Sequence, residues 1–239
     1  MLRIKKHSKL NPVLWNSDNS LRSDVAEILT RIYISFMTVL SNYSGLSLDI
    51  ENDVIDVIFG GSAAEYFYDK NSDIDITLVI RADRYLKQMN PDIFDGFIKF
   101  IQVFFIEKYA PSVNGIPVDI SIVASDSFNF TRYSLIQKKW LREPIKFSDD
   151  EIRKMEIQAD NIYCDIKKEI KLFLKNKANQ EKITIFVHDL QKRRVDAWTD
   201  DIKDYIPFAR AYSRISHQGI IKKMLKIDTD NIKKLMMEK

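Results

Sequence analysis

The residues most able to do chemistry lie in the segment 60–75, GGSAAEYFYDKNSDID, where Ser62 precedes the first of two alternating aspartates by eleven positions. Two glycines let the backbone turn sharply and leave room for a ligand. A helix that starts beside such a turn points its first amides toward it, and those amides bind phosphate oxygens. Neighbouring carboxylates repel one another unless a cation joins them, and Mg²⁺ prefers carboxylate and phosphate oxygens. The segment therefore predicts a site for a nucleoside triphosphate with magnesium.

The flanking residues predict the elements that position this site. Residues 54–59, VIDVIF, are typical of a buried strand that runs into the turn. Residues 63–68 have few helix breakers and predict a short helix. Residues 73–80, DIDITLVI, alternate polar with apolar, which predicts a strand with Asp73 and Asp75 on one face and its isoleucines in a core.

A third carboxylate has the same setting. Residues 116–123, IPVDISIV, alternate in the same way and place Asp119 on the polar face of another strand. If this strand pairs with the strand that carries Asp73, Asp119 joins the acidic cluster. Residues 96–110 between the two strands have apolar residues at helical spacing and predict a helix packed on the sheet.

These residues resemble the DNA polymerase beta-like nucleotidyltransferase superfamily. Its signature is a Gly-Ser turn, a gap of about ten residues, an Asp-hydrophobic-Asp motif and a later strand aspartate, and all four are present in that order. Over residues 8–145, the segments KLNPVLW and YSLIQKKWLREP are also similar to predicted nucleotidyltransferases of large tailed bacteriophages.

The resemblance implies an α+β fold, a mixed sheet flanked by helices, and a two-metal transfer of a nucleoside monophosphate from an NTP, such as ATP, to a hydroxyl. Asp73, Asp75 and Asp119 would be the catalytic, metal-binding residues for Mg²⁺, with Mn²⁺ as an alternative. Gly61 and Ser62 would hold the β and γ phosphates. Either Gly60-Gly61 or Gly61-Ser62 could be the family's turn pair.

Basic side chains are expected to balance the phosphate charge. Residues 132–142 have helical spacing, which would place Ser134, Lys138 and Arg142 near one face, within reach of the triphosphate. The alternative is an amphipathic helix that packs Tyr133, Ile136 and Trp140 inward and leaves its lysines in water.

Other functions stay open on the sequence alone. The aspartates could keep a solvated edge strand soluble, without any ligand. The fold could also be retained without catalysis, either in a nucleotide-binding or antitoxin-like regulatory module, or in a virion-associated structural protein.

Composition and length bound the remaining organisation. The chain has 239 residues, of which 45% are apolar, enough for a catalytic domain at 1–148 and a small α-helical domain at 149–239. Helices are expected at 21–42, 151–175, 180–198 and 207–225. No apolar run approaches the roughly 20 residues that a membrane helix needs, and the first residues lack a signal-peptide core, so we expect a cytoplasmic protein, in the host cytoplasm if phage-encoded. The single cysteine, Cys164, is expected to be buried.

The charge distribution suggests where an acceptor could bind. Residues 1–148 hold 17 basic and 18 acidic side chains, whereas residues 149–239 hold 20 and 16. Basic clusters at 192–194, 210–214 and 222–223 lie beside aromatic residues, a composition that suits a nucleic-acid backbone. An RNA or protein acceptor on the C-terminal helices and an ordinary solvated helix surface both fit this pattern.

Overall fold

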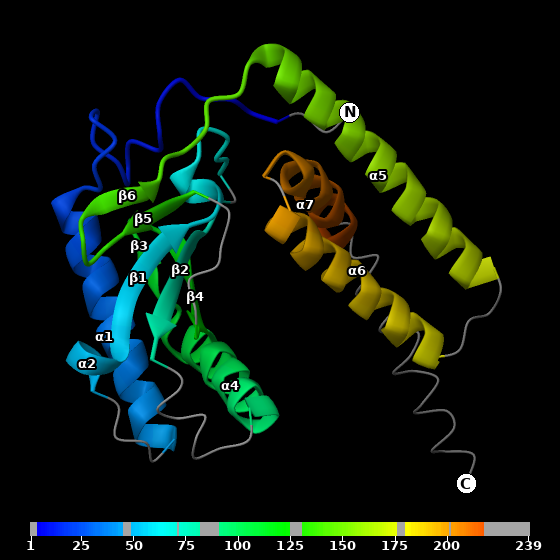
Figure 1. Cartoon of the computed structure of the whole chain (residues 1–239). Helices are drawn as coiled ribbons and strands as arrows, with labels where there is room; N and C mark the ends of the chain where they lie inside the picture. Colours follow the sequence, from blue (N-terminus) through cyan, green and yellow to red (C-terminus); the bar gives the residue numbers. More distant parts are fainter. Residues whose placement is uncertain are drawn as a thin grey trace, which may run out of the picture. The chain divides into compact units, whose positions relative to one another are not determined.

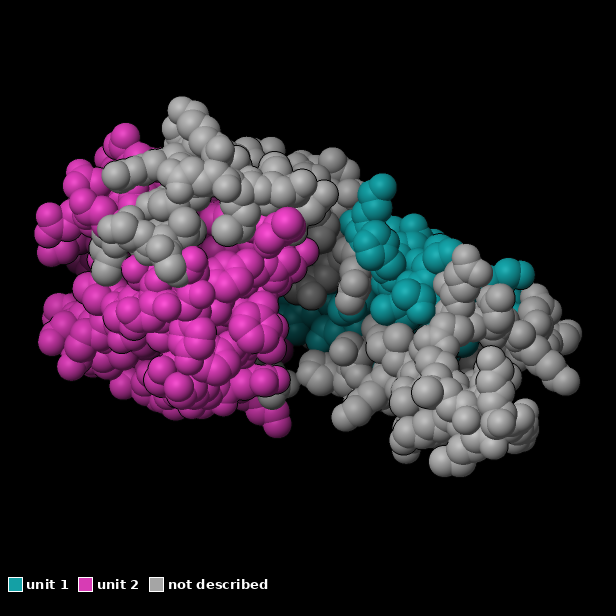
Figure 2. Space-filling view, turned by 90° about the horizontal axis from the view of Figure 1, so that it is seen from below, with its two compact units in different colours: residues 1–4, 147–239 teal, residues 5–146 magenta. Residues whose placement is uncertain are grey.

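The computed structural model describes residues 4–44, 49–70, 72–81, 91–124, 131–175, 180–200 and 202–217. By its contacts the chain divides into two compact units, Lys5–Lys146 on the one hand and Phe147–Lys239 with Met1–Ile4 on the other, coloured separately in Figure 2. Each unit has an apolar core of its own and is described by itself. A domain is a part of the chain that folds independently. The two predicted domains, 1–148 and 149–239, therefore stay a prediction.

A mixed sheet forms the centre of the first unit. The strands are β1 (Val54–Gly60), β2 (Ile74–Ile80), β3 (Ser112–Val113), β4 (Ile116–Val123), β5 (Arg132–Ser134) and β6 (Lys139–Arg142). Their order across the sheet is β3-β4-β2-β1-β5-β6. β2 runs parallel to β4 and antiparallel to β1. The two aspartate-bearing strands therefore pair, which was the condition for Asp119 to join the acidic cluster.

Helices pack against this sheet and bury its apolar residues (Figure 1). They are α1 (Ser23–Ser44) and α4 (Pro91–Tyr109), which match the helices predicted at 21–42 and 96–110 with shifted ends; the short α2 (Ile50–Asp53) directly precedes β1. The alternate apolar positions of β2 and β4 are buried in one core with residues of α1 and α4. With the C-terminal helices described below, this confirms the predicted α+β class.

The predicted helix at 132–142 is wrong, because this segment forms the antiparallel pair of β5 and β6. Lys138 has a φ of 54° in the turn between the strands. The Leu135 amide donates to the Val57 carbonyl at 2.9 Å, so β5 extends the sheet beside β1. Tyr133 and Trp140 face one another in an edge contact at 5.2 Å, which a period of two allows.

The second unit is helical over its described residues. It contains α5 (Asp149–Lys175), α6 (Gln180–Asp200) and α7 (Ile202–His217), which share one apolar core. A capping box starts α5, since Ser148 accepts a bond from the Glu151 amide and Glu151 accepts one from the Ser148 amide. The helix predicted to reach residue 225 is described only as far as His217. None of the described helices is long and apolar enough to cross a membrane.

Cys164 of α5 is exposed, so its predicted burial is wrong. Its neighbour Tyr163 is the residue that α5 turns into the core, and adjacent positions on a helix face different directions.

Candidate active site

Two of the three predicted acids lie side by side on adjacent strands. Asp75 of β2 and Asp119 of β4 are register partners in the parallel pair. Their strand neighbours Ile74, Ile76 and Val118 are buried in the core with α1 and α4. Since successive side chains of a strand point to opposite faces, both carboxylates project from the face away from these helices.

Asp73 lies just before β2 and is exposed. Its charge nevertheless acts on Asp119, as shown by its contribution to the raised pKa of that carboxyl. The alternation that predicted a shared face for Asp73 and Asp75 thus extends one residue beyond the strand itself. The structure places Asp75 and Asp119 opposite one another on paired strands. Asp73 lies just outside β2, two residues before Asp75.

The glycine turn lies directly against Asp75. Gly60, the last residue of β1, is the register partner of Asp75, and Gly61 makes the turn itself with φ 72° and ψ −171°. A Cβ atom placed on Gly61 would lie 1.8 Å from Oδ2 of Asp75. Only glycine fits this backbone conformation and this close approach.

Ser62 begins a single 3₁₀ turn, η1 (Ser62–Ala64), where the sequence predicted a longer helix over 63–68. The amides of Ala64 and Glu65 donate to the carbonyls of Gly61 and Ser62, and Glu65 then becomes extended. The first amides of the turn, those of Ser62 and Ala63, have no acceptor within the 3₁₀ helix.

A serine that the sequence reasoning missed orders this loop. The Ser62 hydroxyl donates to Oγ of Ser72 at 2.9 Å, and the Asp69 amide donates to the same oxygen at 2.9 Å. The bond between Ser62 and Ser72 thus links the glycine turn to the residue directly before Asp73. The turn-forming composition of residues 69–72 was the available signal, because serine hydroxyls in turns bind nearby backbone groups.

A second feature that the sequence reasoning missed is a pair of hydroxyl groups, two residues further along the strands than Asp75 and Asp119. Thr77 and Ser121 are the next register partners along β2 and β4 on the same face, and their hydroxyl oxygens lie 2.8 Å apart. The strand alternation that revealed Asp75 and Asp119 contains this pair as well. It makes the strip of sheet beyond the carboxylates polar.

The electrostatics of Asp119 fit a site that attracts a cation. Loss of water around its carboxyl raises its pKa, and the negative charge of Asp73 raises the pKa further, while the Ile120 amide opposes both. The side chain as a whole stays exposed, so the effect is a local loss of hydration rather than deep burial. A bound cation would relieve the repulsion that disfavours the charged form.

The donor chemistry fits Mg²⁺, because carboxylate oxygens are its preferred protein ligands and substrate phosphates usually complete its shell. Among the described residues no three His, Cys, Asp or Glu side chains gather tightly enough to enclose an ion by themselves. The arrangement is therefore one of paired carboxylates that need further ligands.

The two predicted triphosphate contacts near residue 134 have different settings. Ser134 is fully buried, and its hydroxyl donates to Oδ1 of Asp56 at 2.7 Å. Gln137 donates to the other oxygen of Asp56 at 3.2 Å. Lys138 is exposed in the turn between β5 and β6. Nucleotide contacts from Ser134 and Lys138 stay predictions.

Glu65 is a buried acid that follows the glycine turn. Its side chain is 4% exposed, and burial raises its pKa to about 8. The Thr131 hydroxyl, the Arg142 charge and the Ile145 backbone oppose this shift only in part. The Thr131 hydroxyl makes no well-formed hydrogen bond among the described residues, so its influence on the pKa of Glu65 is weak. Glu65 is therefore protonated at neutral pH.

Replacing Glu65 by glutamine is expected to remove a pH-dependent loss of stability. Because the folded pKa of about 8 lies above the ordinary 4.5, the stabilisation is complete below pH 4.5 and is lost as the pH rises toward 8. The loss is at most about 1.4 kcal/mol per pH unit. Thermal unfolding from about pH 5 to pH 9 should show a falling Tm in the wild type and a flatter profile in Glu65→Gln. The exposed Glu143→Gln is the control, and equal slopes in all three proteins would contradict the assignment.

A mixed sheet that sets a glycine turn against paired strand aspartates fits the resemblance of the sequence to nucleotidyltransferases. Comparison with protein families agrees: the profile described as "Nucleotidyltransferase domain" matches residues 47–221, which is more than half of the chain. The chain therefore belongs to the nucleotidyltransferase domain family. Comparisons with curated proteins and with solved structures find no match.

Proposed function

We propose that this protein is a metal-dependent nucleotidyltransferase that moves a nucleoside monophosphate from an NTP to a hydroxyl acceptor and releases pyrophosphate. The observation that carries the proposal is the meeting of Gly61, Asp75 and Asp119 on one face of the sheet. A triphosphate that binds the turn would extend over the two carboxylates. Family membership supports nucleotidyl transfer as the reaction class.

In this proposal different residues bind the phosphates and the cation. The amides of Ser62 and Ala63 bind the β and γ phosphates at the turn, and the Ser62 hydroxyl joins them by exchanging its bond to Ser72 for one to a phosphate oxygen. Asp73, Asp75 and Asp119 would hold Mg²⁺ or Mn²⁺, which when bound supplies positive charge to the phosphates and lowers the pKa of the acceptor hydroxyl. Lys138 is a proposed additional contact for the phosphates.

Asp119 is suited to take the acceptor proton. Its carboxylate lies in register with Asp75, beside the cation that would activate the acceptor hydroxyl. The acceptor O–H bond breaks, its proton passes to Asp119, and its oxygen attacks the α-phosphorus. The bond from that phosphorus to the oxygen of the β-phosphate breaks in line, and pyrophosphate leaves with the electron pair.

The acceptor remains a separate question. Two arginines of the predicted basic clusters are engaged within the helical unit: Arg193 binds Glu169 and Asp189, and Arg214 lies 3.7 Å from Asp160. These pairs lower the charge available to a nucleic-acid backbone. A small molecule, a protein hydroxyl and an RNA end therefore all stay candidates, and the predicted phage origin and cytoplasmic location stay predictions.

The test is a panel of the four NTPs, each labelled at the α-phosphate, with magnesium and with RNA, lysate protein or small-molecule extracts as acceptors. The wild type should release pyrophosphate and transfer label with at least one NTP, and a chelator should abolish both. Asp75→Asn should lower the rate by about 10²- to 10³-fold, since a carboxylate that would hold the cation beside the phosphates is lost. The hydroxyl-pair variant Ser121→Ala is the matched control on the neighbouring position. Nucleotide binding without label transfer to any acceptor would favour a non-catalytic module instead.

A further inference from the structure

The segment before the family match packs against the glycine turn. We call residues 5–22 the N-terminal arm; it ends at α1, whereas the nucleotidyltransferase profile begins at residue 47. Among the described residues the arm lacks helices and contains a single isolated bridge, between Trp15 and Leu21. Its contacts with residues 63–68 suggest a role that the family match does not assign.

Trp15 is the central contact of the arm. Its side chain is 3% exposed, and its indole N–H donates to the Ala63 carbonyl at 3.0 Å. Its ring stacks on Trp140 at 4.7 Å and lies 5.0 Å from Phe59. The ring of Trp15 is therefore packed among residues of the strands. Its indole N–H, the one polar group of the side chain, binds the 3₁₀ turn.

Two further arm residues bind the chain that follows the turn. The His7 amide donates to the Tyr66 carbonyl at 2.7 Å, and its ring stacks on Tyr68 at 3.9 Å. Nε2 of His7 also lies 3.1 Å from the Tyr68 carbonyl. The Asn19 amide group donates to the Tyr66 hydroxyl at 3.3 Å. Three separated positions of the arm thus hold three positions after the turn.

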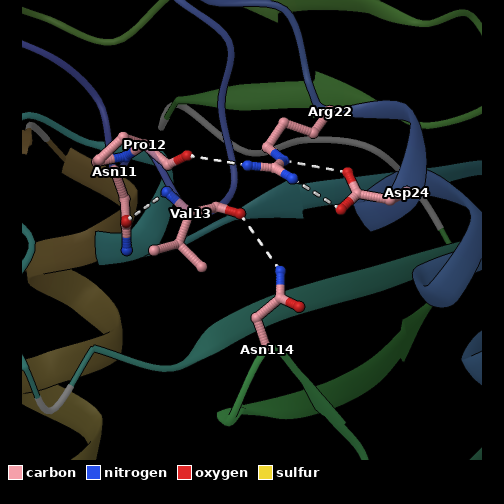
Figure 3. A network of polar contacts seen from close by, with 6 residues as sticks. All are labelled: Asn11, Pro12, Val13, Arg22, Asp24 and Asn114. Atoms are coloured by element: carbon pink, nitrogen blue, oxygen red, sulfur yellow. Dashed lines mark hydrogen bonds and ion pairs between the residues drawn. The ribbon is translucent and has the colours of Figure 1, made fainter.

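The middle of the arm is anchored to the turn between β3 and β4, which leads into the strand that carries Asp119. Figure 3 shows Asn114, in the turn between β3 and β4, donating to the Val13 carbonyl at 3.4 Å. Arg22 reaches the Pro12 carbonyl at 3.5 Å and forms an ion pair with Asp24 at the start of α1. The arm therefore connects the strand end that leads to Asp119 with the glycine turn.

A three-residue 3₁₀ helix has too few internal bonds to fix its own orientation. The Ala63 carbonyl belongs to the peptide that follows the Ala63 amide, so the bond from Trp15 limits rotation of the backbone whose amides would face the phosphates. We propose that the arm, through Trp15 and His7, positions the glycine turn for triphosphate binding. The inference rests on the proposed function, because the turn must bind phosphates for its position to matter.

The test measures phosphate binding without a base. Isothermal calorimetry with magnesium tripolyphosphate should show that Trp15→Phe, which keeps an aromatic ring and removes the N–H donor, binds about three- to tenfold more weakly than the wild type, the effect of one lost hydrogen bond. His7→Phe, which keeps a ring for Tyr68 and removes Nε2, should weaken binding in the same direction. Where an NTP substrate is known, its KM should rise by the same factor with kcat little changed.

Phe36→Leu is the matched control, since Phe36 is fully buried between α1 and α4 and contacts Phe105, not the turn. It should lower the Tm as much as Trp15→Phe and leave tripolyphosphate binding unchanged. If Trp15→Phe fails to fold, His7→Phe decides. Wild-type affinity in the folded arm variants would overturn the inference alone. A wild type that binds neither tripolyphosphate nor any NTP would overturn it together with the proposed function.

Discussion

Replacing Gly61 by alanine is expected to lower kcat/KM by at least about 10²-fold. The new methyl group would overlap Oδ2 of Asp75, 1.8 Å away, so either the turn or the carboxylate must move. A displacement of about 1 Å at a reacting centre is enough for such a loss. The backbone adds a cost, because φ 72° with ψ −171° belongs to a region open almost only to glycine, of order 1–3 kcal/mol for other residues. Steady-state rates with the identified NTP and a thermal unfolding curve measure both effects.

Gly115→Ala is the control that separates strain from overlap. Gly115 also has a positive φ, 81°, but a Cβ atom there would meet no atom within 4 Å. We expect Gly115→Ala to lose stability through backbone strain and to keep its activity. If both variants were equally active, the contact between the turn and Asp75 would have no role in catalysis.

The strands that carry the acids could be predicted because their sequence patterns are local and unambiguous. Asp119 alternates with Val118 and Ile120, both buried, and the strand was predicted at its observed bounds, Ile116–Val123. One buried face fixes the direction of every side chain in a strand. The shared face of Asp75 and Asp119 therefore followed once the strands were assumed to pair.

The error at residues 132–142 shows where local pattern fails. Tyr133, Ile136 and Trp140 have helical spacing, yet Tyr133 and Trp140 meet across two strands, and Ile136 is exposed at the turn. Two distant parts of the chain favour the strand pair instead. β5 hydrogen-bonds to the edge of β1, and the ring of Trp15, more than a hundred residues earlier, contacts Tyr133. Tertiary contacts of this kind override local propensity and have no signal in a short window.

The environment of the glycine turn was equally hidden in the sequence. The GGS motif predicted a turn, but the approach to Asp75, the bond from Trp15 and the burial of Glu65 depend on residues brought together only by folding. The motif also offered Gly60-Gly61 and Gly61-Ser62 as the turn pair; Gly61, which both pairs share, has the positive φ, and the choice between the pairs stays a prediction. Spacing predicted which residues meet, and packing determined how closely.

Replacing Asp119 by asparagine is expected to abolish activity and, without divalent cations, to raise the Tm. The activity loss should be about 10³-fold, because the variant loses both a proton acceptor and a cation ligand. The stability gain follows from the raised pKa of Asp119. A folded pKa above the ordinary 3.8 means that the wild type loses stability as the pH rises through that window, and asparagine does not ionise. At neutral pH the Tm of the variant should lie above that of the wild type, and the difference should vanish near pH 3.

Magnesium with a triphosphate should reverse this order. A ligand that binds only the folded state stabilises the protein in proportion to its affinity, so the wild type should gain Tm on addition of both and Asp119→Asn should gain less. Glu107→Gln removes an exposed acid of the same unit and serves as the control for net charge. An Asp119→Asn protein that is less stable than the wild type in a chelator would show that the carboxylate supports the fold. A variant that is more stable but inactive would show that the Asp119 carboxylate lowers the stability of the fold and supplies a charge that the reaction requires.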